Sequence, residues 1–114
     1  MEYVYNAFCE RVIDGDTVVC VVDLGFKIKT TQIFRLADID AHELRDKNKG
    51  KHDKAILEKL FVENAILGKQ ITIKSKKTGK YGRWIGEITY FCKFDNSYKD
   101  LGKSIVKYQQ MSEV

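Results

Sequence analysis

The chain has 114 residues, of which 44% are hydrophobic, so it suits one packed domain and is too apolar for global disorder. Lysine and arginine outnumber aspartate and glutamate by 20 to 16, an excess that permits a polyanionic partner without requiring one. We therefore expect a single domain over residues 1–114, in which the placement of charge matters more than its sum.

The cysteines, Cys9, Cys20 and Cys92, form no C-x-x-C pair, and with only 2 histidines the chain is not expected to bind zinc. Each lies in an apolar or β-like run, which favours reduced, buried thiols and a reducing compartment. The N-terminus lacks the features of a signal peptide, and no run approaches the ~20 apolar residues of a membrane helix. We expect no membrane partner, and a cytoplasmic location as written, or secretion if a leader has been removed.

The first part of the chain has a β pattern. Residues 3–13 alternate loosely between apolar and polar side chains, and Asp14-Gly15-Asp16 then signals a turn. Residues 17–28 are rich in valine, with a bend at Leu24-Gly25, and residues 30–38 form another β-type run. These runs predict a meander of antiparallel strands.

The middle of the chain changes character. Residues 45–51 contain no apolar side chain, which predicts an exposed loop. An amphipathic helix of about four turns is then expected, beginning near Asp53 and stopping at Gly68. Its expected apolar face consists of Leu57, Leu60, Phe61 and Ala65.

The last part predicts two more strands and a closing helix. Residues 70–75 and 84–91 have the strand pattern, with a turn rich in glycine and lysine over residues 76–83. Residues 95–97 mark another turn, and residues 98–111 predict a helix with Leu101, Ile105 and Tyr108 on one face. A five-stranded barrel with a helix after its third strand is the OB arrangement.

Segments with chemically active side chains lie at residues 12–18 (VIDGDTV), 34–43 (FRLADIDAHE) and 79–83 (GKYGR). Each alone has an ordinary structural explanation: a hairpin turn, solvated carboxylates at a strand end, and a basic turn between strands. His42 is interpreted as a surface residue. Only the combination of the segments predicts chemistry.

Together these segments hold the parts that phosphodiester hydrolysis needs. Asp16 and Asp40 supply hard anionic oxygens, which suit Ca²⁺ or Mg²⁺. Arg35 and Arg83 could clamp a phosphate through bidentate hydrogen bonds. Glu43 follows Asp40 closely enough to take a proton from a water near the metal.

Over nearly its whole length the chain resembles the staphylococcal nuclease (thermonuclease) family. The match rests on residues 13–18, on Phe34-Arg35-Leu36 followed by Asp40-Ala41-His42-Glu43, and on Lys80-Tyr81-Gly82-Arg83, in the family's order and spacing. The resemblance implies a fold that is mainly β with helices (α+β), a five-stranded OB-like β-barrel with two to three α-helices. It also implies Ca²⁺-dependent endo- and exonuclease activity on DNA and RNA.

The resemblance implies a metal site for one Ca²⁺ ion. Asp16 and Asp40 would be ligands through their carboxylates, and Ala41 would be a third through its backbone carbonyl. Asp14 would lie next to these ligands without binding the ion itself. Mg²⁺ could occupy the same site, but we do not expect it to support activity as Ca²⁺ does.

The resemblance also assigns the reacting groups. Arg35 and Arg83 would bind the phosphate, and Glu43 would activate the attacking water. Lys80 and Tyr81 would lie near the phosphate or base of the nucleotide.

The sequence departs from the family at several positions. Ala41-His42 replaces the usual Thr-Pro between the metal-binding aspartate and Glu43, which removes a hydroxyl and a rigid proline. Asp38 adds a carboxylate where an apolar residue is usual. The C-terminus stops early, whereas family members often carry more chain there, with aromatic residues near the nucleotide. Tyr108 could take the place of these aromatic residues.

Basic residues flank the predicted site in two groups, and both could follow a phosphate backbone. The first group contains Lys74, Lys76, Lys77, Lys80 and Arg83; the second contains Arg45, Lys47, Lys49, Lys51 and Lys54. We single out Lys49 and Lys51 as nucleic-acid contacts. The expected partner is single-stranded or frayed DNA or RNA, bound by a monomer.

A catalytically inactive OB-fold module that binds nucleic acid or protein is the alternative. In the family's non-catalytic relatives the acidic and arginine positions are lost. Here they are all retained: Asp16, Arg35, Asp40, Glu43 and Arg83. This retention favours the enzyme.

Overall fold

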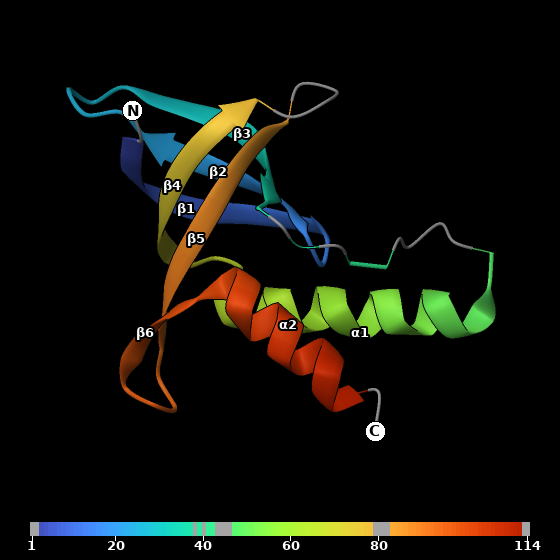
Figure 1. Ribbon diagram of the computed structural model, residues 1–114. Helices are drawn as coiled ribbons and strands as arrows, with labels where there is room; N and C mark the ends of the chain where they lie inside the picture. The colour runs from blue at the N-terminus through green and yellow to red at the C-terminus, as the bar shows by residue number, and fades with distance from the viewer. Residues whose placement is uncertain (1–2, 38, 40, 43–46, 79–82, 113–114) are drawn as a thin grey trace.

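The structure is a computed structural model that describes residues 3–37, 39, 41–42, 47–78 and 83–112 (Figure 1). In chain order its elements are β1 (Tyr3–Asp14), β2 (Thr17–Asp23), β3 (Lys29–Leu36), α1 (Lys49–Ile66), β4 (Gln70–Thr78), β5 (Trp84–Cys92), β6 (Ser97–Asp100) and α2 (Leu101–Ser112). Within these residues no helix has the length and apolar character needed to cross a membrane.

The strands form a closed barrel. They follow the order β3-β2-β1-β4-β5-β6, and a parallel pairing of β3 with β5 joins the ends of the five-stranded ring. The short β6 pairs with β5 outside that ring. The predicted α+β fold with a five-stranded barrel is therefore confirmed, and the described residues contain two helices.

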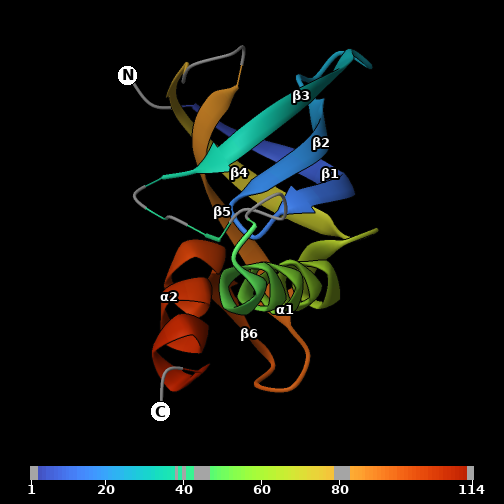
Figure 2. The same ribbon diagram turned by 90° about the vertical axis from the view of Figure 1, so that its right-hand side faces the viewer.

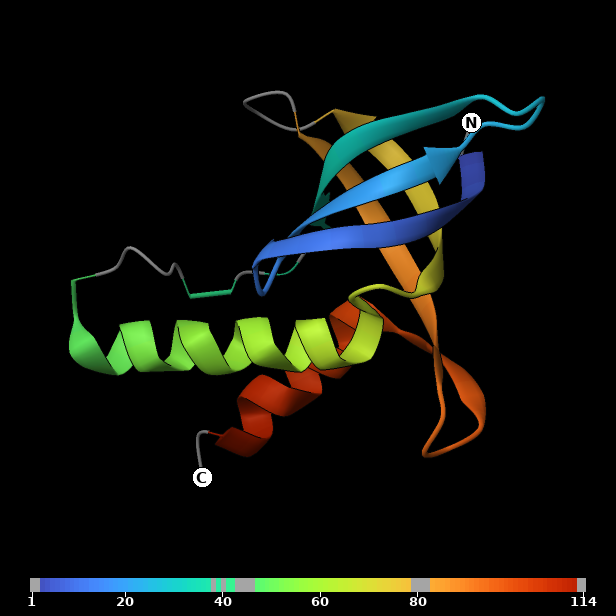
Figure 3. The ribbon, with the colours of Figure 1, turned by 180° about the vertical axis from the view of Figure 1, so that it is seen from behind.

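The core occupies the part of the barrel next to α1 and continues into the layer of helices. Alternate side chains of each strand point inward, as the strand period requires, and include Cys20, Phe34, Ile73 and Ile88. Helix α1 lies across one end of the barrel with α2 beside it (Figures 1, 2 and 3). Because Ile66 of α1 belongs to the same buried cluster, the helix closes that end of the barrel.

Helix α1 begins earlier than the sequence predicts. Asn48 caps it by accepting a hydrogen bond from the backbone N–H of Lys51 at 3.2 Å, so Lys49 to Lys51 belong to the helix and not to a loop. The apolar pattern could not reveal this turn because its residues are exposed. The predicted stop was correct: Leu67 is the C-cap and Gly68 has φ +71°, a left-handed conformation that favours glycine.

The predicted buried face of α1 was partly wrong. Leu57 and Leu60 are 51% and 48% exposed, whereas Phe61 and Ala65 do pack against the core. The fully buried side of the helix consists of Ala55, Glu58, Val62 and Ile66. Apolar residues occur nearly all round this helix, so spacing alone did not fix which side meets the barrel.

Two further boundaries differ from the prediction. Residues 24–28 are the turn between β2 and β3, closed by a hydrogen bond from Leu24 N–H to the Ile28 carbonyl at 2.9 Å, and not a bend within one strand. The closing helix starts at Leu101, because residues 97–100 pair with β5 as β6. Its predicted inner face is confirmed for Leu101 and Ile105, which are fully buried.

The cysteines agree with the prediction of reduced, buried thiols for two of the three. Cys9 and Cys20 face each other across β1 and β2 and are fully buried, whereas Cys92 is half-buried. A hydrogen bond between the first two thiols lowers the pKa of Cys9. The same bond and burial raise the pKa of Cys20.

Candidate active site

The turn between β1 and β2 lies at the barrel end that faces α1 (Figure 3), and Asp16 belongs to this turn. It is only 8% exposed. Its Oδ1 accepts a hydrogen bond from the Thr17 hydroxyl at 2.9 Å, and its Oδ2 accepts one from the backbone N–H of Ala41 at 3.1 Å. A carboxylate fixed in this way is a defined anionic site and not a solvated turn residue.

Arg35 reaches the same carboxylate from β3. Its Nη2 lies 3.8 Å from Asp16 Oδ2 and 3.5 Å from the carbonyl oxygen of Ile39. The strand pairing explains this proximity, since Arg35 is the register partner of Thr17, the residue after Asp16. The arginine side chain is 38% exposed, so one part of it contacts the site while another part faces solvent.

Arg83 is half-buried and immediately precedes β5. In the parallel pairing of β3 with β5, Arg35 is the partner of Ile85. Side chains of register partners share a side, so Arg35 and Ile85 lie on the same side of this pair, and Arg83 lies two residues before Ile85. The fold therefore brings both predicted phosphate-binding arginines to the pair of β3 and β5.

A buried carboxylate that the sequence did not reveal holds the segment after β3. Glu58 of α1 is 2% exposed. Its Oε2 accepts hydrogen bonds from the backbone N–H of His42 at 3.3 Å and from Gln109 Nε2 of α2 at 3.1 Å. Its Oε1 pairs with His42 Nδ1. The sequence predicts His42 as a surface residue; its side chain is 33% exposed, and it is also a partner of Glu58.

Gly15 allows the parts of this site to meet. A Cβ atom at this position would lie 3.0 Å from the Cβ atoms of both Ala41 and Glu58, a contact so tight that one of these neighbours would have to shift. The turn, the segment after β3 and helix α1 are thus in direct contact. This contact accounts for the glycine between Asp14 and Asp16.

Several predicted site residues lie outside the described residues: Asp38, Asp40, Glu43, Lys80 and Tyr81. Lys49 and Lys51 are exposed in the first turn of α1, in the part of the helix that extends beyond the barrel (Figure 1). Tyr108 stacks on Phe61 with 4.8 Å between ring centroids, so it packs α2 against α1.

The described part of the site offers oxygen atoms of the kind that bind hard cations. Asp16 offers carboxylate oxygens, the ligands that Ca²⁺ prefers, and Ala41 lies directly beside it. Among the residues that the structure describes, no group of three or more His, Cys, Asp or Glu side chains could hold a metal ion. A ligand set of three such side chains would thus need residues outside this part of the chain, where Asp40 lies.

The sequence profile of the staphylococcal nuclease homologue family matches residues 33–109. The chain belongs to this family, whose domains are nucleases or nucleic-acid-binding OB-folds. The matched region contains the end of β3, all of α1, most of α2, and Arg35 and Arg83, whereas Asp16 precedes it. No curated protein matches the chain.

Proposed function

We propose that this protein is a Ca²⁺-dependent nuclease that hydrolyses phosphodiester bonds of DNA or RNA. The observation that carries the proposal is the convergence of two distant motifs, in which Asp16 Oδ2 lies 3.8 Å from Arg35 Nη2 and 3.1 Å from the N–H of Ala41. The carboxylate of Asp16, which would bind the ion, and the guanidinium of Arg35, which would bind phosphate, thus lie in one site. This site is next to the segment that precedes Glu43. Family membership supports the same function.

In this proposal, each residue has one task. Asp16, Asp40 and the carbonyl of Ala41 would hold the ion, which supplies positive charge to polarise the phosphate. Arg35 and Arg83 would donate hydrogen bonds to the non-bridging oxygens as their negative charge grows. Glu43 would accept a proton from the water that attacks phosphorus.

Cleavage is expected to require Ca²⁺, and the ion is expected to bind weakly without substrate. Two carboxylates and one carbonyl supply few of the about 6–8 oxygens that Ca²⁺ takes, so water and phosphate must supply the rest. Mg²⁺ needs a tighter octahedron and is expected to bind with little turnover. Cleavage of denatured DNA with Ca²⁺, with Mg²⁺ and with chelator tests this, and full activity in excess chelator would reject the proposal.

Glu58 is proposed as a positioning residue for this reaction. Two successive backbone N–H groups are held by carboxylates, Ala41 by Asp16 and His42 by Glu58. The next residue is Glu43, the proposed base. Glu58 would therefore replace, through hydrogen bonds, the rigidity that the family's usual proline gives to this segment.

Glu58→Gln is expected to lower kcat by about ten- to 10²-fold with little change in KM, because a small misplacement of a reacting group has costs of this size. The amide keeps the shape of the side chain but must turn an N–H toward one of the present donors. Glu63→Gln, on the same helix, is the matched control. Equal kinetics for both variants, with thermal unfolding unchanged, would show that Glu58 does not position the segment.

A further inference from the structure

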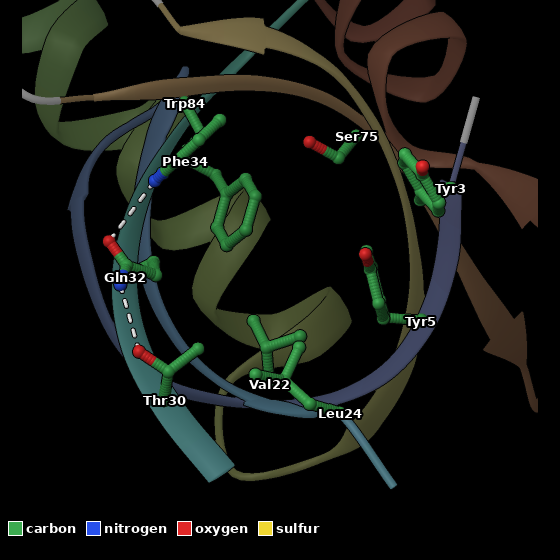
Figure 4. Close-up of a pocket in the computed structure, with 9 residues that line it drawn as sticks. All are labelled: Tyr3, Tyr5, Val22, Leu24, Thr30, Gln32, Phe34, Ser75 and Trp84. Atoms are coloured by element: carbon green, nitrogen blue, oxygen red, sulfur yellow. Dashed lines mark hydrogen bonds between the residues drawn. The ribbon is translucent and has the colours of Figure 1, made fainter. Parts of the chain in front are cut away.

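The end of the barrel away from α1 is open and holds a cavity of about 310 Å³ (Figure 4). Figure 4 shows aromatic and polar side chains around its mouth. The aromatic residues are Tyr3, Tyr5, Phe34 and Trp84, and the polar ones include Gln32 and Ser75. No charged side chain lines the cavity among the described residues.

Hydrogen bonds and a ring contact hold part of the cavity wall in place. Trp84 Nε1 donates a hydrogen bond to Gln32 Oε1 at 3.1 Å, and Gln32 Nε2 donates one to the Thr30 hydroxyl at 2.8 Å. The rings of Tyr3 and Tyr5 are stacked, with centroids 6.2 Å apart. Such a preformed site, apolar with polar groups at its edge, suits a flat aromatic ring that carries hydrogen-bonding groups.

The cavity lies on the opposite face of the strands that carry the proposed phosphate-binding arginines. Phe34 and Trp84 are register partners across β3 and β5, and both line the cavity. Arg35 follows the phenylalanine and Arg83 precedes the tryptophan. Since side chains alternate along strands, Phe34 and Trp84 face the mouth of the barrel, whereas Arg35 lies on the outside of the barrel.

Two lysines of β4 are sequence neighbours of a residue that lines the mouth. Lys74 and Lys76 flank Ser75 on β4, and Lys76 forms an ion pair with Glu87 at 2.8 Å. A polymer that alternates negatively charged phosphates with flat bases matches this arrangement of basic and aromatic side chains. A base paired within a duplex could not enter the cavity, so the chemistry favours a single strand.

We propose that the barrel mouth is a stacking site for one base of a single-stranded nucleic acid, adjacent to the phosphate held at Arg35 and Arg83. The proposal rests on the proposed function for the position of that phosphate. It adds a base-binding subsite inside the barrel, which gives a structural reason for the expected preference for single strands. Base binding can be measured without cleavage, so the two proposals are tested separately.

Trp84 is the only tryptophan, which makes its fluorescence a direct probe of the mouth. The protein is titrated in chelator with a short single-stranded DNA and with a sugar–phosphate oligomer of equal length and charge that lacks bases. We expect the DNA to quench the fluorescence and the base-free oligomer to leave it nearly unchanged. Binding of labelled versions of both oligomers is followed in parallel by fluorescence anisotropy.

Trp84→Leu is expected to weaken binding of the DNA about 5- to 150-fold, the range of base stacking on aromatic side chains, and to leave the base-free oligomer unaffected. Tyr98→Leu is the matched control, because Tyr98 is 76% exposed on β6 and does not line the cavity. Tyr3→Leu, at a 53% exposed position, gives a second test if the tryptophan variant folds poorly.

The outcomes separate this proposal from the nuclease. Arg35→Lys should weaken binding of both oligomers, whereas Trp84→Leu should weaken only that of the DNA. Base-dependent binding without cleavage in Ca²⁺ would reject the nuclease and support the base site. Equal binding of both oligomers, or stronger quenching by an aromatic dipeptide than by the DNA, would overturn the base site.

Discussion

Glu43→Gln is expected to retain DNA and metal binding while losing most turnover. Glu43 is not among the proposed metal ligands, so the ion should stay. Glutamine has nearly the same shape as glutamate but cannot accept a proton from water at neutral pH. General-base catalysis is worth about 10²–10⁴-fold, so the loss should be of that size.

The measurement compares single-turnover cleavage with binding for the wild type and for Glu43→Gln at saturating Ca²⁺. Binding should change little, and could tighten as a negative charge leaves the site. Asp38 is a second carboxylate near the segment in sequence, and if it were the base, Glu43→Gln would cleave almost normally. Near-normal cleavage would reject the assignment of Glu43 without rejecting the nuclease.

Arg35→Lys and Arg83→Lys are each expected to lose most activity although the charge is kept. A planar guanidinium can hold two phosphate oxygens while the phosphorus becomes trigonal bipyramidal, and a lysine ammonium cannot reproduce that fork. For Arg35 the geometry adds a second reason, because its Nη2 also lies 3.8 Å from Asp16 and 3.5 Å from the Ile39 carbonyl. The lysine side chain is shorter and ends in a single ammonium group, so it would not maintain all of these contacts.

Turnover of both arginine variants is measured at saturating Ca²⁺, and circular dichroism checks their folding. Lys93→Gln is a suitable control, because Lys93 is an exposed cation in the turn between β5 and β6, outside the proposed site. Near-normal rates in both arginine variants would show that these side chains are peripheral to the reaction.

Much of the barrel was predictable because its strands carry a clear local pattern. The turn at Asp14-Gly15-Asp16 and the alternation after it locate β1 and β2, and the stop at Gly68 locates the end of α1. The start of this helix was missed because Asn48 caps a turn that buries nothing. Local sequence patterns were thus enough to locate most strands and helices, whereas the exposed start of α1 depends on a side-chain hydrogen bond.

The candidate site was predictable only in part. Motif spacing identified Asp16 and Arg35, which the fold brings together. Glu58 was missed because a glutamate on a helix is ordinarily solvated, and its burial depends on partners far away in sequence, His42 and Gln109. No local pattern carries such long-range contacts. The pairing of His42 with Glu58 was missed for the same reason.

The most direct test of the account follows binding and cleavage in one sample. Excess wild-type protein is mixed with end-labelled denatured DNA in Ca²⁺, and the fractions of bound and of cut strand are read at each time point. The nuclease account predicts that bound strands are cut in Ca²⁺ and remain intact, though bound, in chelator. Stable complexes with intact DNA in Ca²⁺ and in Mg²⁺ would contradict it and identify the protein as a binding module.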